Sequence, residues 1–358
     1  MTTIQDAIQL ILDGSDLTGE TISGCLKEIV DGTATPAQIA GLLVGLRKKG
    51  ETVDEIAAFA STLRGYSTMN DRPRVKGRMI DMCGTGGDAF KTPNVSTIAS
   101  FVAAGAGAVV AKHGGRSVTS KSGSADVLEK LGFNLGMEPS RVKTSIEQIG
   151  IGFMFAPAFH PAMKHVAPVR KELGVRTVFN LMGPLINPAR VDAQLLGLYT
   201  PTLVPQVAAV LGKLGLQEAM VVHGLEGLDE ISVTGKTLVS RLRDGQIETR
   251  EYSPRDFGLR EGPLIPPTGP RDSEDGAMLA ISILSGDSKE RDCGTLMVLV
   301  NTAACLVLAQ KATSFEDAIG LAAESIKSGK AMGKLEQMVK FSGGSLEGAR
   351  ERYARQKR

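Results

Sequence analysis

The sequence predicts an α/β protein in which a small N-terminal helical domain precedes a larger α/β domain, whose central, mainly parallel sheet is surrounded by helices. Over the first 70 residues, apolar side chains recur at three- and four-residue intervals, which is the pattern of amphipathic helices. After a polar, basic stretch at 70–78, short apolar runs end in glycine-rich loops and are followed by helical segments. The 358 residues allow one large or two unequal domains, so we expect a helical domain at 1–72 and an α/β domain at 73–358.

Four short helices are predicted in the first domain. Gly14, Gly32 and Gly50 lie where helices should end. Thr35 and Pro36 suit an N-cap and a first helical position. The four apolar patterns are IQDAIQLIL (4–12), ISGCLKEIV (22–30), PAQIAGLLVGL (36–46) and VDEIAAFASTL (53–63).

The second domain begins with alternating strands and helices. The segment 160–190 is rich in proline, lysine and arginine and breaks this rhythm, so we expect part of it to pack on the helical domain. Asp244-Gly245 lies between two alternating segments and predicts a hairpin. From Ser273 onward three long patterns predict helices, some of them buried nearly all round. The predicted strands are 79–83, 107–111, 152–156, 193–199 and 219–224.

Composition excludes several classes of protein. The formal net charge is only +2, so no strong overall field recruits nucleic acid or an anionic membrane. The four cysteines show neither C-x-x-C spacing nor histidine partners at metal-ligand intervals, which favours free cytosolic thiols. The N-terminus carries acidic residues and no basic leader, and no stretch reaches the ~18 apolar residues of a membrane span. A cytoplasmic protein is expected.

The first glycine-rich loop, GTGGDA at 84–89, fits the dinucleotide pattern G-x-G-x-x-G/A. Asp88 would face a pyrophosphate without a compensating cation, and residues 91–93 intervene before a helix starts, which argues against a Rossmann site. The run Asn94 to Thr97 offers polar side chains at the start of a helix. These side chains either cap the helix or leave its N–H groups free for an anion.

A second loop of the same kind follows the next predicted strand. KHGGRSVTSKSGSADVLEKLG (112–132) gathers basic and hydroxyl side chains around three glycines and again opens onto a helix. Loops after successive parallel strands lie side by side at the carboxyl edge of a sheet. Together the two loops predict a site for a ligand with two phosphate groups. In the competing interpretation Lys112 is a solvated surface lysine.

Two adjacent carboxylates, Asp229 and Glu230, follow a glycine-broken loop after the strand predicted at 219–224. They either lie on a solvated turn or hold Mg²⁺ for the phosphate ligand, because Mg²⁺ is normally bound by one or two carboxylates together with waters and phosphate oxygens. The available oxygen donors are Asp88, Ser96, Asp229 and Glu230.

Four ordered motifs resemble those of the anthranilate phosphoribosyltransferase family over nearly the whole chain. The motifs are GTGGD with NVST, KHGGRSVTSKSGSADVLE, HPAMKHVAPVRKELGVRTVFNLMGPLINPA and VHGLEGLDEIS. The resemblance implies transfer of a phosphoribosyl group from 5-phosphoribosyl-1-diphosphate to the amine of anthranilate, a step of tryptophan biosynthesis. It also implies two Mg²⁺ ions per subunit and a homodimer formed through the helical domain.

The resemblance assigns the substrate and metal residues by motif match. Ser96, Asp229 and Glu230 would hold Mg²⁺, and Gly84, Gly115 and Arg170 would contact anthranilate, Arg170 through its carboxylate. From sequence alone, Arg170 is equally a surface arginine on a helix. The residues assigned to the diphosphate sugar are Gly84, Gly87, Asp88, Thr92, Asn94, Val95, Ser96, Thr97, Lys112, His113, Gly114, Gly115, Arg116, Ser117, Val118, Thr119, Ser120 and Ser124.

One position departs from the family pattern. The family commonly reads KHGN, whereas Gly115 replaces that asparagine here, so only a backbone contact to anthranilate is available at this position.

The implied chemistry is displacement of diphosphate through an oxocarbenium-like state, which needs positioning and charge stabilisation but no covalent nucleophile. We therefore expect His113 to have a structural or loop-ordering role.

Two alternatives are kept. A pyrimidine nucleoside phosphorylase resembles this family in fold, but its phosphate acceptor gives less reason for Asp229 and Glu230, and Mg²⁺ dependence would separate the two. A nucleic-acid-binding relative is allowed by the basic residues at 112–121, although the net charge of +2 and the carboxylates weigh against it; steeply salt-dependent DNA binding without turnover would favour it.

Overall fold

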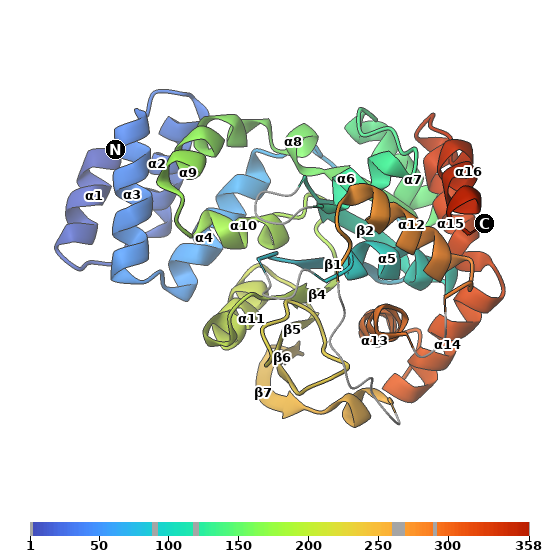
Figure 1. Ribbon diagram of the computed structural model, residues 1–358. Coiled ribbons are helices and arrows are strands. Elements are labelled where there is room, and N and C mark those ends of the chain that lie inside the picture. Colours follow the sequence, from blue (N-terminus) through green and yellow to red (C-terminus); the bar gives the residue numbers. More distant parts are fainter. Residues whose placement is uncertain (1–2, 88–91, 117–121, 260–268, 289–291, 358) are drawn as a thin grey trace.

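The computed structural model describes most of the chain as helices around one central sheet (Figure 1). The N-terminal helices lie at one end of the molecule and the C-terminal helices at the other. The described residues are 3–87, 92–116, 122–259, 269–288 and 292–357.

The four helices predicted at the N-terminus are confirmed. Each begins after a threonine whose side chain accepts a hydrogen bond from a backbone N–H of the first turn. Thr35 caps the third helix with Pro36 in its first turn, and Gly50 ends that helix with φ 90°. The helices are α1 (Ile4–Leu12), α2 (Gly19–Val30), α3 (Pro36–Lys49) and α4 (Val53–Gly65).

A seven-stranded sheet forms the centre, in the order β3-β2-β1-β4-β5-β6-β7. The first five strands in this order are parallel to one another, so their carboxyl ends lie at one edge. The last two form the predicted hairpin, and Asp244 and Gly245 at its turn have φ of 50° and 76°, as a tight two-residue turn of this kind requires. The strands are β1 (Met79–Gly84), β2 (Val109–Gly114), β3 (Ile151–Phe155), β4 (Ala193–Gly197), β5 (Glu218–Gly224), β6 (Thr237–Arg243) and β7 (Gln246–Tyr252).

The second strand differs from its predicted position at 107–111. Gly107 has φ 91° and belongs to the turn before the strand, and pairing with β3 continues from Val110 to Gly114. Lys112 and His113 are therefore buried strand residues, whereas the sequence analysis placed them in the following loop.

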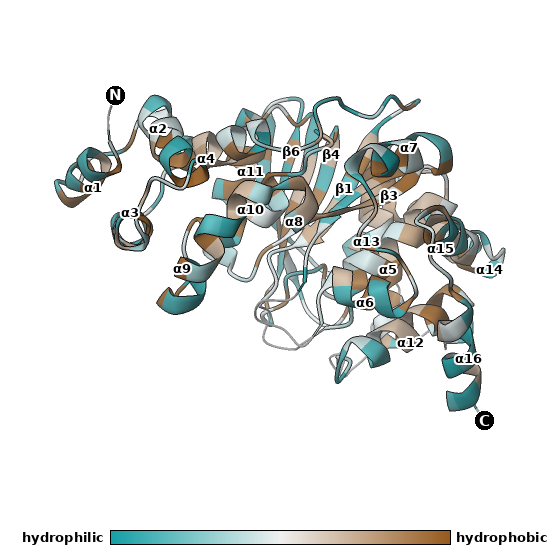
Figure 2. Cartoon of the chain, turned by 90° about the horizontal axis from the view of Figure 1, so that it is seen from above, coloured by the Kyte–Doolittle hydropathy of each residue, from teal (hydrophilic) through white to brown (hydrophobic). Residues whose placement is uncertain are grey.

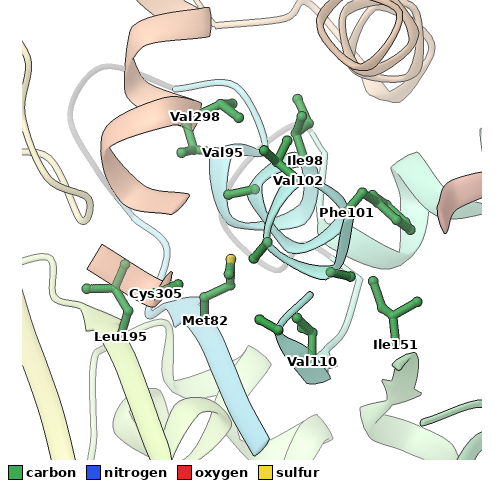
Figure 3. Close-up of a cluster of buried hydrophobic side chains, with 14 of the residues drawn as sticks. Met82, Val95, Ile98, Phe101, Val102, Val110, Ile151, Leu195, Val298 and Cys305 are labelled. Carbon is green, nitrogen blue, oxygen red and sulfur yellow. The ribbon is translucent and has the colours of Figure 1, made fainter. Parts of the chain in front are cut away.

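Two helices, α5 (Val95–Gly105) and α13 (Cys293–Leu308), pack on one face of the sheet. Figure 3 shows Val95, Ile98 and Phe101 of α5 in one cluster with Val298 of α13 and with side chains of the strands, such as Met82. Most residues of α13 are buried, which confirms the prediction of a helix buried nearly all round.

A second apolar cluster joins α1–α4 to the other side of the sheet. It includes α11 (Val204–Lys213) and also Val166, Val169 and Phe179 from the segment that breaks the strand-helix alternation. Figure 2 shows that apolar colouring is concentrated on the strands and on helix faces turned inward, while α16 (Glu347–Gln356) at the C-terminus is largely hydrophilic.

All four cysteines are free, and none of the described helices is long and apolar enough to cross a membrane.

The remaining described elements complete the outer layer. The remaining elements are α6 (Ser124–Lys130), α7 (Pro139–Ile149), α8 (Ala156–Phe159), η1 (Pro161–His165), α9 (Val166–Leu173), α10 (Phe179–Leu185), η2 (Pro201–Leu203), η3 (Pro254–Phe257), α12 (Ser273–Leu284), α14 (Phe315–Lys327), α15 (Lys330–Phe341) and α16 (Glu347–Gln356).

Candidate active site

A cavity of about 650 Å³ opens at the carboxyl ends of β1 and β2. Its walls come from the two glycine-rich loops, from residues 156–186 and from the pair Asp229 and Glu230. Ligands of parallel α/β sheets bind at this edge. The two glycine-rich loops lie side by side there because they follow the paired strands β1 and β2.

Asn94 connects the two loops. It occupies the N-cap position of α5, yet its side chain makes no capping hydrogen bond to the helix. Its Nδ2 donates instead to the Ser122 carbonyl oxygen at 3.2 Å. The interpretation of Asn94 as a simple helix cap is therefore wrong, and the start of α5 faces the cavity through Asn94, Val95 and Ser96.

Lys112 lies under the first loop. Its side chain is buried, and its ammonium donates to the Met82 carbonyl oxygen at 2.7 Å and to Ser96 Oγ at 3.1 Å. The interpretation of Lys112 as a solvated lysine is wrong. With two protons engaged by the protein, this lysine fixes the Ser96 hydroxyl and brings positive charge to the cavity wall.

A buried carboxylate, Asp81, accompanies Lys112 inside the sheet. Asn187 Nδ2 donates to Asp81 Oδ2 at 2.8 Å and to the Ala111 carbonyl oxygen at 2.9 Å, and the His113 N–H donates to Asp81 Oδ1 at 3.3 Å. Burial raises the pKa of Asp81, and the Lys112 charge and these hydrogen bonds oppose that rise. The aspartate inside the apolar run MIDMC was the sequence signal for this network.

Asp229 and Glu230 are 7% and 8% exposed, so the interpretation as a solvated turn is wrong. The Gly86 N–H donates to Asp229 Oδ2 at 2.7 Å. Two glycines make room for Asp229. A Cβ on Gly197 would lie 1.6 Å from the Asp229 carbonyl oxygen, and a Cβ on Gly84 would lie 2.3 Å from Asp229 Oδ2.

The donor set at this end of the cavity fits Mg²⁺. Asp229, Glu230 and Ser96 supply two carboxylates and a hydroxyl that line the same cavity, and Mg²⁺ is usually completed by phosphate oxygens and water. Among the described residues no group of three or more His, Cys, Asp or Glu side chains could hold a metal.

Two histidines that line the cavity form an edge-to-face pair, with the ring centres of His113 and His160 5.2 Å apart. His113 Nδ1 lies 2.9 Å from the Gly183 carbonyl oxygen, and because a carbonyl only accepts, the proton is on Nδ1. The Nε2 atoms of both rings are buried without a hydrogen-bond partner in the described part of the chain. Burial lowers the pKa of His113 to about 3 and that of His160 to about 4, so both rings are neutral at pH 7.

Arg170 lines the cavity from α9, with its guanidinium 6.0 Å from the ring centre of Phe179. Burial lowers the pKa of Arg170. Arg170 is half-buried, and its place in the cavity lining favours a substrate contact over the alternative of a surface arginine. Arg116 also lines the cavity, but its guanidinium is paired with Asp126 and Glu129 at 2.8 Å.

The position that departs from the family pattern, Gly115, has space around it. A Cβ there would meet only Ala156 Cβ, at 3.8 Å, among the described atoms.

The structure brings most of the sequence-predicted residues to one cavity. Thr97 is an exception, since it lies outside the lining and its hydroxyl donates to Oγ of the lining residue Ser124 at 2.9 Å. Asp88, Ser117, Val118, Thr119 and Ser120 lie outside the described residues. The predicted residues in the lining are Gly84, Gly87, Thr92, Asn94, Val95, Ser96, Lys112, His113, Gly114, Gly115, Arg116, Ser124, Arg170, Asp229 and Glu230.

Sequence reasoning missed most of the lining between residues 156 and 186. That segment formed one of the four motifs, but only Arg170 was selected from it. Arg176 was missed as well: its guanidinium lies 3.8 Å from the Tyr199 ring centre and donates to the Gly87 carbonyl oxygen at 3.2 Å. The missed lining residues with polar or large side chains are His160, Met163, Lys164, Phe179, Asn180, Met182 and Ile186.

Comparison with known proteins gives two family matches, which together span most of the chain. Residues 76–332 match the glycosyl transferase family, a/b domain, and residues 5–67 match the glycosyl transferase family, helical bundle domain. Anthranilate phosphoribosyltransferase of Petrotoga mobilis is 46% identical over 94% of this chain and 96% of its own length. That of an Anaeromyxobacter species is 50% identical over 94% and 98%.

Two solved structures show the same fold over nearly all residues. Anthranilate phosphoribosyltransferase of Thermus thermophilus has a TM-score of 0.86 at 40% identity, covering 94% of this chain and 99% of its own. The enzyme of Saccharomyces cerevisiae in complex with PRPP and Mg has a TM-score of 0.85 at 30% identity, covering 95% and 98%.

Proposed function

The chain belongs to the anthranilate phosphoribosyltransferase family, and on that premise we propose that it transfers the phosphoribosyl group of 5-phosphoribosyl-1-diphosphate to the amine of anthranilate. The products are N-(5-phosphoribosyl)anthranilate and diphosphate, in tryptophan biosynthesis. The observation that carries the proposal is that both glycine-rich loops and the pair Asp229 and Glu230 face one cavity.

The diphosphate sugar is assigned to the end of the cavity formed by the two loops. The start of α5 directs backbone N–H groups there, which favours a phosphate group. Lys112 adds a buried positive charge directly below. The loop residues outside the described part, Asp88 and Ser117 to Ser120, are proposed as further contacts on the basis of their motifs.

We assign the metal to Ser96, Asp229 and Glu230, which supply oxygen donors suited to Mg²⁺. When bound, Mg²⁺ would stabilise the negative charge that develops on the leaving diphosphate. A structure of the yeast relative contains PRPP and Mg, which supports the use of this ion. Two ions per subunit are proposed from the family motif.

Anthranilate is assigned to the other end, where Arg170 offers a guanidinium for its carboxylate. Gly84 and Gly115 are proposed to contact it through the backbone. The neutral rings of His113 and His160 also line the cavity. Their low pKa values make them weak bases at pH 7, which supports a positioning role for His113.

In the reaction the anthranilate nitrogen forms a bond to ribose C1 while the bond from C1 to the diphosphate oxygen breaks, and the nitrogen then releases one proton. The nitrogen lone pair is already free, so the protein contributes alignment and charge stabilisation. We assign both roles to residues at or beyond the carboxyl ends of the parallel strands, which line the cavity.

We also propose a homodimer formed through α1 and α3. These helices expose large apolar side chains, with Leu12 71%, Val44 44% and Leu10 38% exposed. A cytoplasmic location is proposed from the four free cysteines.

The test measures consumption of anthranilate through the loss of anthranilate fluorescence. The signal should fall only when protein, 5-phosphoribosyl-1-diphosphate and Mg²⁺ are all present, and a constant signal under those conditions would overturn the proposal. Turnover without Mg²⁺ and with phosphate as acceptor would favour the nucleoside phosphorylase alternative. As a second test, the double variant Asp229→Asn with Glu230→Gln should retain its thermal unfolding temperature and lose metal-dependent turnover.

A further inference from the structure

Asn301 is a buried amide in the middle of α13, and it is 1% exposed. Most residues around it on this helix are apolar and buried. Burying an amide without hydrogen bonds costs roughly 2–7 kcal/mol, so a buried asparagine needs partners. None of the functions proposed above uses it.

The partners of Asn301 lie on the segment that carries the two carboxylates. Its Oδ1 accepts from the Ile231 N–H at 3.1 Å, and its Nδ2 donates to the Ile231 carbonyl oxygen at 3.4 Å. The same Nδ2 donates to the Met297 carbonyl oxygen of its own helix at 2.9 Å. The amide therefore binds both polar groups of Ile231, as a neighbouring strand would, and Ile231 directly follows Glu230.

The same segment also bonds to the first loop, because the Gly86 N–H donates to Asp229 Oδ2 at 2.7 Å. The segment of the two carboxylates is therefore held by the β1 loop at Asp229 and by α13 at Ile231.

We propose that Asn301 is a positioning residue, which holds the backbone at Ile231 so that Asp229 and Glu230 present their carboxylates to the metal of the substrate complex. The inference rests on the proposed function, because the metal role of the two carboxylates does. Loss of hydrogen bonds that orient metal ligands typically weakens metal binding by roughly 10- to 100-fold. Asn301 acts through the backbone, so we expect about 10-fold.

The test compares Asn301→Ala with a matched control, Thr302→Val. Thr302 is the next residue of the same helix, is fully buried, and its hydroxyl has no partner among the described residues, so the control removes a buried polar atom without touching the carboxylate segment. If Asn301→Ala does not fold, Asn301→Ser serves instead, because a serine hydroxyl can still donate to the carbonyl one turn back in its own helix but does not reach Ile231.

Two measurements decide the outcome. Hydrogen exchange of the peptide around Ile231 should be faster in the Asn301 variant than in wild type and unchanged in Thr302→Val. Mn²⁺ binding is measured in the presence of 5-phosphoribosyl-1-diphosphate from the electron paramagnetic resonance signal of free Mn²⁺. The affinity for Mn²⁺ should be about 10-fold lower in the Asn301 variant and unchanged in Thr302→Val.

Equal exchange and equal Mn²⁺ binding in a folded Asn301 variant and wild type would overturn the inference. Faster exchange with unchanged Mn²⁺ binding would also overturn it, because Asn301 would then order the backbone without serving the metal. Failure of the proposed function would look different, since wild type itself would leave anthranilate unconsumed.

Discussion

Adding one methyl group at Gly84 should impair the site without disturbing the fold. Gly84 ends β1 and has no left-handed backbone conformation that would make alanine strained. The Cβ of an alanine would lie 2.3 Å from Asp229 Oδ2, 3.0 Å from Cγ and 3.2 Å from the carbonyl oxygen. The expected effect of Gly84→Ala is therefore a displaced Asp229 carboxylate.

The size of the effect follows from these distances. Carbon and oxygen atoms in ordinary contact are separated by about 3.4 Å, so the carboxylate must retreat by about 1 Å. That movement stretches the hydrogen bond from the Gly86 N–H, now 2.7 Å. A misplacement of 1 Å near the chemistry costs roughly 100-fold in rate, which corresponds to about 2.7 kcal/mol.

The assay is anthranilate consumption at varied Mg²⁺, from which kcat/KM and the Mg²⁺ midpoint are obtained. Gly320→Ala is the matched control, because its added Cβ has nothing within 4 Å and Gly320 lies in α14, outside the cavity lining. We expect kcat/KM to fall roughly 100-fold and the Mg²⁺ midpoint to rise in Gly84→Ala, with thermal unfolding near that of wild type. Wild-type kcat/KM and midpoint in the folded variant would refute the assignment of Asp229.

Four further outcomes are expected. Arg170→Ala should raise KM for anthranilate roughly 100-fold while KM for the diphosphate sugar stays constant; equal changes in both would contradict the assignment. Gly115→Asn should lower KM for anthranilate, since the site has room for a side chain, and an increased KM would show that the backbone contact is preferred. The pKa values of His113 and His160, about 3 and about 4, lie below the ordinary 6.5, so the unfolded chain takes up more protons than the folded one as the pH falls. The free energy of unfolding should therefore decrease from about pH 6.5 towards pH 4. Denaturant titrations at pH 7 and 5 check this, and His113→Gln should reduce the dependence of the unfolding free energy on pH. Leu12→Glu with Val44→Glu should convert a dimer to a monomer in light scattering, whereas an unchanged mass would exclude the α1 and α3 surface.

The sequence predicted the elements whose signals are local. Thr35 and Pro36 define a helix start by their own chemistry, and Asp244 and Gly245 define a hairpin because both adopt positive φ at a two-residue turn. The order of the seven strands was not predicted, but the adjacency of β1 and β2 was, because successive strands of an α/β protein usually lie side by side.

Strand boundaries were less predictable where polar residues extend a buried strand. The run GAVVA predicted a strand at 107–111, but β2 extends to Gly114 because its partner β3 provides pairing for that length. A lysine and a histidine look like loop residues until the chain has folded. Their burial depends on partners far away in sequence, among them the carbonyl oxygens of Met82 and Gly183.

The residues of the site also divide into those with a local sequence signal and those whose partners are distant in sequence. Ser96, Asp229 and Glu230 were selected because their motifs suit a metal-bound diphosphate, and each of them lines the cavity. Asn301 and Asp81 were not selected, because neither belongs to a recognised catalytic or binding motif. Both are polar residues inside apolar runs, and both bond to a segment of the site, Asp81 to the His113 N–H and Asn301 to Ile231.

A buried polar residue in an apolar run is costly unless its hydrogen bonds are made. At these two positions the hydrogen bonds go to chain segments that bear proposed substrate-binding or metal-binding residues. These bonds offset the free-energy cost of burial and fix the geometry of the site. Buried polar residues of a core strand or helix therefore indicate which distant segment is being positioned, once the fold supplies the partner. In this protein β1 and α13 each contribute such a residue, and its hydrogen bonds reach the strand of His113 and the segment that follows Glu230.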